Sequence, residues 1–421
     1  MSEAHSYEEM PVAHREEERF VPPLPRISIQ CFCETPGVHA VLAEAAADRR
    51  AKRAHVTVQM GGIPAAREFY DAAPTPNVIV AESSASHDAM LMALDSLAEV
   101  CDPATKVIVV GHTNDILLYR QLISRGVTDY LVAPIDTLDF LGAVSRVFGA
   151  DKSETLGRAI AFVGARGGAG SSTIAHNVAW AISQDLMQDV MIADLDLPFG
   201  TAGLNFNQDP VQGIADAIFA GERLDETFVD RLTSKCTERL SLMAAPGTLE
   251  REYDIEQTPL DQLFALLRHA VPAIVVDVPH VWTGWAKETL VAADDIVVVT
   301  TPDLAGLRNA KNLVDKLKSS RQNDRAPHLV INQVGVPKRP EIAPKDFAAS
   351  IGIDPAGVIA FDPQLFGTAA NNGQMIAEMQ AAAKPVETFA HLAEMLMGRR
   401  EIRQRKRFAL APMLSKLRGK G

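Results

Sequence analysis

The sequence predicts an α/β protein made of two doubly wound parallel-sheet domains. Short apolar runs alternate along the chain with helical patterns, which is typical of parallel sheets. The central runs are continuously apolar, as expected for strands that helices cover on both faces. A polar stretch, "GADKSETLGR" at 149–158, separates two such patterns. The chain of 421 residues is long enough for each pattern to enclose its own core.

The first pattern fills residues 26–148 and the second fills residues 158–398, with a linker at 149–157. In the first, strands are expected at 26–32, 55–60, 77–83, 106–112 and 129–134, and helices at 37–53, 86–100 and 115–126. In the second, strands are expected at 158–165, 189–196, 240–245, 273–278, 294–302, 328–334 and 358–363, and a helix at 172–184. Residues 1–25, acidic and proline-bearing, predict a disordered arm, and residues 399–421 form a basic tail.

Charge is distributed unevenly along the chain. The net charge is −12, yet the tail at 399–421 holds nine Lys/Arg residues and one Glu. The acidic body disfavours general affinity for DNA, whereas a basic tail favours an anionic surface. Three interpretations of the tail stay open: a helix on a membrane surface, a solvated segment, or a contact with an acidic protein. The N-terminus lacks an apolar signal segment, and no two of the four cysteines form a Cys-x-x-Cys pair, so a cytoplasmic location is expected.

The stretch "GARGGAGSSTIAHNVAWAIS" at 164–183 has the features of a phosphate-binding loop. It follows an expected strand and opens an expected helix, which is the context that such a loop requires. Its glycines allow backbone N–H groups to approach phosphate oxygens, and the helix start favours an anion. The residues expected to bind ATP are Arg166, Gly167, Gly168, Gly170, Ser171, Ser172, Thr173 and, from a later strand, Asn332.

Both lysines that usually mark such a loop are replaced. Arg166 stands at the first lysine position and keeps its charge, whereas Ser171 at the second does not. Losing one such preorganised charge typically costs on the order of 10²–10³ in rate. We therefore expect nucleotide binding with weak or absent hydrolysis. Appreciable ATPase activity and complete loss of binding remain the alternatives.

Carboxylates at strand ends predict a magnesium site. Asp194 and Asp196 follow the second strand of this domain, and Asp277 closes the apolar run "AIVVDV". Asp196 and Asp277 are the candidates for organising Mg²⁺ and the attacking water, with the Ser172 hydroxyl as a further metal ligand.

The segment "LISRGVTDYLVAPID" in the first domain resembles response-regulator receiver domains. Ala133 occupies the position of their lysine, and the strand that should end in the phosphoacceptor Asp offers Ala81 and Glu82. The resemblance therefore implies a domain for docking or dimerisation that cannot be phosphorylated. Glu82 is interpreted either as a permanent phosphate mimic or, preferably, as a solvated glutamate at a strand end.

The whole arrangement resembles the TadZ/CpaE proteins of Flp-type (tight adherence) pilus assembly, which join a receiver-like domain to a MinD/ParA-like P-loop ATPase domain. The resemblance covers about residues 26–395 and implies a homodimer, the base contact of Asn332, and a place at a cell pole, peripheral to the inner membrane. It also implies docking to pilus secretion components or a polar scaffold through the receiver-like domain. The alternative function is an active ParA-like ATPase that positions or segregates cargo or DNA. A metabolic ATPase would need the missing lysine.

Overall fold

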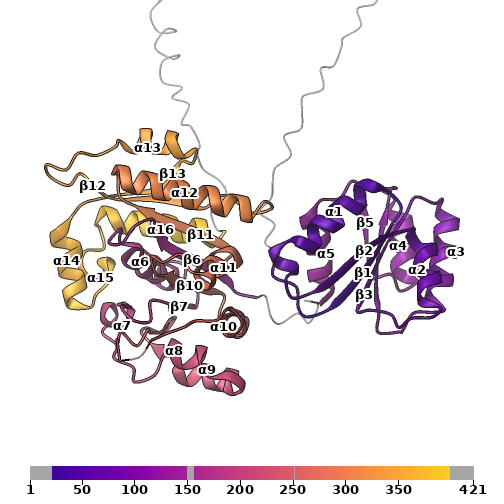
Figure 1. The fold of residues 1–421 in the computed structure, drawn as a ribbon, viewed down its shortest axis with the longest axis horizontal. Coiled ribbons are helices and arrows are strands. Elements are labelled where there is room, and N and C mark those ends of the chain that lie inside the picture. The colour runs from indigo at the N-terminus through magenta and orange to yellow at the C-terminus, as the bar shows by residue number, and fades with distance from the viewer. Residues whose placement is uncertain (1–20, 149–155, 251, 399–421) are drawn as a thin grey trace, which may run out of the picture. The chain divides into compact units, whose positions relative to one another are not determined.

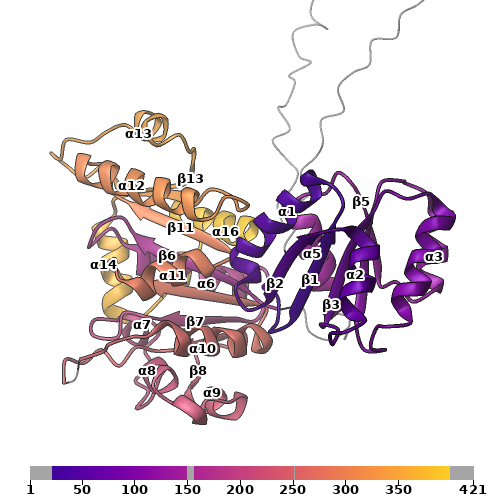
Figure 2. The ribbon, with the colours of Figure 1, turned by 45° about the vertical axis from the view of Figure 1, so that its right-hand side comes forward.

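The computed structural model describes residues 21–148, 156–250 and 252–398. The chain forms two compact units (Figures 1 and 2). Of the described residues, the first unit comprises 21–148 and 156 together with the short segment 320–325, and the second comprises 157–250, 252–319 and 326–398. The expectations for residues 1–20, for most of the linker and for the basic tail concern residues outside the described ranges.

The first unit contains a five-stranded parallel sheet in the order β2-β1-β3-β4-β5. This order is typical of a doubly wound sheet, the class of sheet that the sequence predicts. The strands are β1 (Ser28–Cys33), β2 (His55–Met60), β3 (Val78–Ser83), β4 (Lys106–Gly111) and β5 (Asp129–Val132). The helices are α1 (Pro36–Ala47), α2 (Gly62–Tyr70), α3 (His87–Ala98), α4 (Ile116–Ser124) and α5 (Thr137–Phe148).

Helices cover both faces of this sheet. One apolar core lies between the sheet and α1 and α5, and a second lies under α2, α3 and α4. Val21 and Leu24 are buried in the first of these cores, although both lie in the stretch expected to be a disordered arm. Cys31 and Cys33 are buried free thiols on β1.

The second unit contains an eight-stranded sheet in the order β13-β12-β11-β6-β10-β7-β9-β8. The strands are β6 (Arg158–Gly164), β7 (Val190–Asp194), β8 (Ser234–Lys235), β9 (Leu240–Met243), β10 (Ala273–Val278), β11 (Asp295–Thr300), β12 (His328–Val334) and β13 (Pro355–Ala360). All pairs are parallel except β8 with β9, a short antiparallel edge that the sequence pattern does not reveal.

The helices of the second unit are α6 (Ser171–Gln184), α7 (Ala202–Asn205), α8 (Ile214–Ile218), α9 (Glu226–Leu232), α10 (Gln257–Ala270), α11 (Gly284–Ala292), α12 (Leu304–Ser320), α13 (Pro344–Ile351), α14 (Pro363–Asn372), α15 (Ile376–Met379) and α16 (Lys384–Leu396). Helices α10 to α13 pack on one face, and α6 and α16 pack on the other. The carboxyl ends of the parallel strands share one edge, where ligands of such sheets bind. Across the described ranges, no helix is both long and apolar enough to span a membrane.

Candidate functional site

The glycine loop, residues 165–170, connects β6 to α6 at the carboxyl edge of the second unit's sheet. Gly168 and Gly170 have φ angles of +77° and +89°, a left-handed conformation that residues with a Cβ rarely adopt. A Cβ on Gly170 would also lie 2.5 Å from Nδ2 of Asn332. Gly170 is the N-cap of α6, and no side chain caps this helix. The first N–H groups of α6 are therefore available to an anion such as phosphate.

Side-chain amides from β12 hold the loop in this shape. Asn332 Nδ2 donates to Ala169 O over 2.9 Å, and Gln333 Nε2 donates to Gly168 O over 2.9 Å. Gln333 has a φ of +57°, at a point where the register of β12 against β13 shifts. Asn332 is buried and uses one N–H of its amide on the loop itself. Its contact with a nucleotide base stays a prediction.

Arg166 is the cation of the loop, and in this structure a carboxylate binds it. Its Nη1 donates to Asp303 Oδ2 over 3.0 Å, and the Arg166 side chain is 45% exposed. Asp303 also accepts hydrogen bonds from Thr301 Oγ1 and from the Gly306 N–H. Burial alone would raise the pKa of Asp303, but these hydrogen bonds and the charge of Arg166 lower it. A phosphate would therefore compete with Asp303 for the guanidinium.

No lysine nearby in the sequence replaces the one that is missing at Ser171. Ser171, Ser172 and Thr173 form the first turn of α6 and are half-buried. No lysine occurs between residues 153 and 234. The loop thus offers backbone N–H groups and hydroxyls, which suit binding of phosphate better than stabilisation of the charge that develops during hydrolysis.

Two carboxylates lie side by side at the ends of neighbouring strands. Asp194 of β7 and Asp277 of β10 are partners in the parallel register, and they are 0% and 3% exposed. Burial raises the pKa of Asp194, and the charge of Asp277 raises it further. Burial likewise raises the pKa of the half-buried Asp196. A cation at this point would relieve the repulsion between the carboxylates.

The donor set suits Mg²⁺ held jointly with a nucleotide. In the described ranges, no three His, Cys, Asp or Glu side chains are grouped so as to hold a metal ion. Protein Mg²⁺ sites commonly use one or two carboxylates and complete the octahedron with water and phosphate. Ser172, Asp196 and Asp277 are the residues that could supply such oxygens, with Asp194 beside them.

One buried histidine next to Asp277 was not predicted from the sequence. His176 of α6 is 0% exposed, and its Nε2 lies 3.5 Å from Asp277 Oδ2. Its Nδ1 is 2.9 Å from Asn205 Nδ2, so the imidazole nitrogen accepts there. Nε2 makes no hydrogen bond among the described residues, apart from this longer approach to the carboxylate. A polar residue within the apolar helical run "STIAHNVAW" is the signal that could have revealed it.

Glu82 lies at the carboxyl end of β3 in the first unit and binds the residues that follow β1. This side chain is 1% exposed, so the interpretation of Glu82 as a solvated glutamate is wrong. One oxygen accepts from the backbone N–H groups of Glu34 and Thr35 at 2.7 and 2.8 Å. The other accepts from Thr35 Oγ1 at 2.6 Å and lies 3.0 Å from His112 Nε2. Burial would raise the pKa of Glu82, but these hydrogen bonds lower it.

Comparison with known proteins identifies relatives of both units. The family model of the cellulose biosynthesis protein BcsQ matches residues 158–337. A ParA family ATPase from Chlorobium tepidum is 26% identical, with a TM-score of 0.52 over 56% of this chain and 98% of that chain. The septum site-determining protein MinD of Bacillus subtilis is 24% identical over 258 residues, 58% of this chain and 90% of that protein.

The N-terminal part of the chain is similar to a solved pilus assembly protein CpaE from Caulobacter crescentus. The two are 46% identical over 30% of this chain and 98% of that chain, with a TM-score of 0.29. The chain belongs to the CpaE/TadZ family. Its second unit has the MinD/ParA-type P-loop NTPase fold, and its first unit is similar to the receiver-like N-terminal domain of CpaE proteins. The fold class predicted from the sequence is therefore confirmed.

Proposed function

We propose that this CpaE/TadZ family member is a localisation and assembly factor for Flp-type pilus secretion machinery, and that it acts as a nucleotide-binding switch or scaffold with weak or no ATP hydrolysis. One observation carries this proposal: the loop has two glycines at left-handed φ and opens a helix that no side chain caps, although neither lysine is present. Left-handed Gly168 and Gly170, the uncapped start of α6 and the strand-end carboxylates all favour Mg²⁺–ATP.

The loop and the strand-end carboxylates have separate roles in this proposal. The backbone at Gly167, Gly168 and Gly170 and the hydroxyls of Ser171 and Thr173 would contact phosphate oxygens. Ser172 would ligate Mg²⁺, while Asp196 and Asp277 would orient its bound water. When Mg²⁺ is bound, it supplies the positive charge that the missing lysine no longer provides to the phosphates.

Weak hydrolysis follows from the charges in the loop. Ser171 offers a dipole where a full charge would face the transferring phosphoryl group, and Arg166 is engaged by Asp303. A loss of about 10²–10³ in rate is expected for one such missing donor. Occupancy of the site, rather than turnover, would then carry the signal.

Exposed apolar side chains support a homodimer. Phe199, Trp282 and Leu304 follow β7, β10 and β11 and are 67%, 53% and 75% exposed. Large apolar side chains at one edge of a sheet are candidates for protein contact. A second copy over this edge would cover them together with the nucleotide.

Helix α4 supports docking of pilus components on the receiver-like unit. Ile116, Tyr119 and Ile123 recur at helical spacing and are 67%, 43% and 38% exposed. By analogy with the family, the assembly would lie in the cytoplasm at a cell pole, peripheral to the inner membrane. The basic tail is the proposed membrane contact and lies outside the described residues.

The experiment is calorimetric titration of Mg²⁺–ATP into the full chain, with phosphate release measured on the same samples. Micromolar binding with slow or undetectable release supports the proposal. Rapid release would instead support the ParA-like ATPase function. Absence of binding would contradict the nucleotide switch and leave the scaffold.

A further inference from the structure

The start of helix α12 is attached to the first two residues of the glycine loop, Ala165 and Arg166. Asp303 precedes the helix, binds Arg166 and accepts from the Gly306 N–H over 2.8 Å. Six residues after Asp303, Asn309 Nδ2 donates to Ala165 O over 3.0 Å. The first part of α12 therefore cannot move without changing contacts to the loop that is proposed to hold phosphate.

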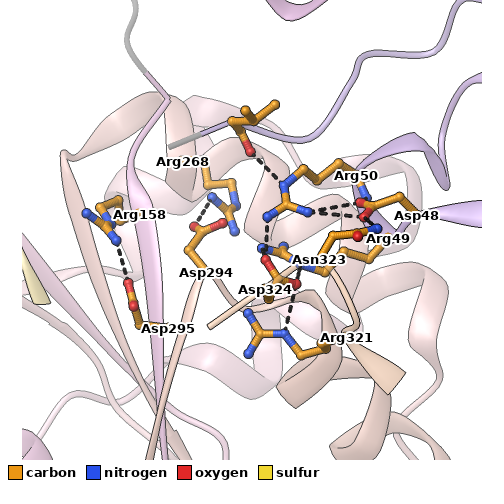
Figure 3. A network of polar contacts seen from close by, with 11 residues as sticks. Asp48, Arg49, Arg50, Arg158, Arg268, Asp294, Asp295, Arg321, Asn323 and Asp324 are labelled. Carbon is orange, nitrogen blue, oxygen red and sulfur yellow. Dashed lines mark hydrogen bonds and ion pairs between the residues drawn. The ribbon is translucent and has the colours of Figure 1, made fainter. Parts of the chain in front are cut away.

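The chain that follows α12 belongs to the first unit. It leaves the second unit at Ser319, contributes residues 320–325 to the first, and returns at Ala326. Asp324 is the centre of this segment's contacts (Figure 3). Its Oδ2 accepts from Arg49 Nε over 2.7 Å, and its Oδ1 accepts from Arg49 Nη2 over 3.1 Å and from Arg50 Nη2.

These residues belong to one network of polar contacts, which we call the arginine cluster: Asp48, Arg49, Arg50, Arg321, Asn323 and Asp324. Arg321 Nε donates to Asp324 Oδ2 over 3.1 Å, and Asn323 Nδ2 donates to Asp48 Oδ2 over 3.2 Å. The ionised side chains of the arginine cluster expose between 3% and 8% of their surface: Asp48, Arg49, Arg50, Arg321 and Asp324. Buried charges with several partners tolerate little displacement, because a broken contact leaves a charge without water or counter-ion.

The body of α12 is suited to transmit a displacement between its ends. It has 17 residues and so spans about 25 Å. Gly306, Ala310, Val314 and Leu317 are buried along one face against the core of the second unit. A helix packed in this way shifts as a body, by small translations or rotations, rather than bending locally.

We propose that α12 couples occupancy of the glycine loop to the arginine cluster, and thereby to the receiver-like unit. This inference rests on the proposed nucleotide binding. Phosphate would draw Arg166 away from Asp303, because guanidinium binds phosphate through paired, charge-assisted hydrogen bonds. Asp303 would then lose its cation at the start of α12, and the shift of the helix would reach residues 320–325. The coupling is reciprocal, so the arginine cluster also sets the affinity of the loop.

The first test needs no nucleotide. Hydrogen–deuterium exchange of the full chain is compared between the wild type, Asp303→Asn and Asp324→Asn. The matched control is Asp315→Asn, whose carboxylate makes an exposed pair with Lys311 on the same helix. Asp303→Asn should raise exchange in residues 320–325, and Asp324→Asn should raise it in the glycine loop, each by about threefold or more. Effects confined to the mutated end of α12, or equal effects in the control, would overturn the coupling.

The second test measures linkage directly. Mg²⁺–ATP is titrated into the same variants, and Asp324→Asn should change the Kd by about fivefold or more, whereas Asp315→Asn should leave it unchanged. An unchanged Kd in Asp324→Asn contradicts the proposal. Asn323→Ala, which removes one hydrogen bond of the cluster, gives a milder variant if circular dichroism shows that Asp324→Asn unfolds. If the wild type binds no nucleotide, the proposed function fails, and the exchange experiment still decides the coupling.

Discussion

Replacement of Glu82 by Gln tests whether a fixed carboxylate holds the strand-end loops of the receiver-like unit. The amide has almost the same volume but no charge. Glu82 accepts from the N–H groups of Glu34 and Thr35 and from the Thr35 hydroxyl, and it lies 3.0 Å from His112 Nε2. Hydrogen bonds to a charged group contribute about 1 kcal/mol more than those between neutral groups. Loss of the charge from the two backbone bonds alone predicts a destabilisation of about 2 kcal/mol.

The measurement is urea unfolding of the full chain, followed by pulsed hydrogen–deuterium exchange in peptides from β3. Tryptophan fluorescence would not serve, because Trp180, Trp282 and Trp285 all lie in the second unit. The matched control is Glu99→Gln in the same unit, where the side chain is exposed and a change within about 0.5 kcal/mol is expected.

The pH dependence adds a second criterion. The hydrogen bonds lower the pKa of Glu82 below its ordinary value of 4.5. The stability that ionisation of Glu82 contributes is therefore complete above pH 4.5 and declines as the pH falls through the lower pKa of the folded state. The difference between wild type and Glu82→Gln should shrink in acid. A Gln variant as stable as the wild type at pH 7 would refute the argument.

Three further predictions concern the arginine cluster and the glycine loop. Burial would raise the pKa of Asp324, but hydrogen bonds from Arg49 and the charges of the three arginines of the cluster lower it from 3.8 to about 2. The ionised Asp324 therefore stabilises the fold by about 2 kcal/mol. Urea titrations should show this contribution complete above pH 3.8, declining toward pH 2 and missing in Asp324→Asn. Gly170→Ala places a methyl group against Asn332 at a left-handed φ. Calorimetry should find Mg²⁺–ATP binding weakened by about tenfold or more. The control Gly367→Ala, whose methyl group would meet no other atom within 4 Å, should bind normally. Ser171→Lys restores a positive charge to the loop. A phosphate-release assay should find the rate of ATP hydrolysis raised by about 10²-fold. An unchanged rate would contradict the role assigned to the missing lysine.

Local patterns were sufficient to predict most strands of the two sheets. The apolar run 273–278 coincides with β10, and 55–60 coincides with β2. These strands depend on side chains adjacent in sequence, so their pattern is visible without a partner. The two-residue β8 has no apolar pattern of its own, because its pairing with β9 alone defines it.

The glycine loop and the acidic strand ends were also predictable, because spacing along one strand and one helix defines them. Contacts between distant segments were not. Asp324 lies 275 residues from Arg49 in sequence, and nothing near either residue indicates the other. The burial of Glu82 and the packing of His176 beside Asp277 likewise depend on neighbouring strands. Such positions look like ordinary polar residues until the sheet brings their partners together.

The central claim, that a loop without lysines still binds nucleotide, is tested most directly by calorimetric titration of Mg²⁺–ATP, with sedimentation of the same samples and Asp277→Ala as the control. We predict micromolar binding that shifts monomer to dimer in the wild type and fails in Asp277→Ala. No heat of binding and an unchanged sedimentation coefficient would contradict this claim and would leave the glycine loop with a structural role only.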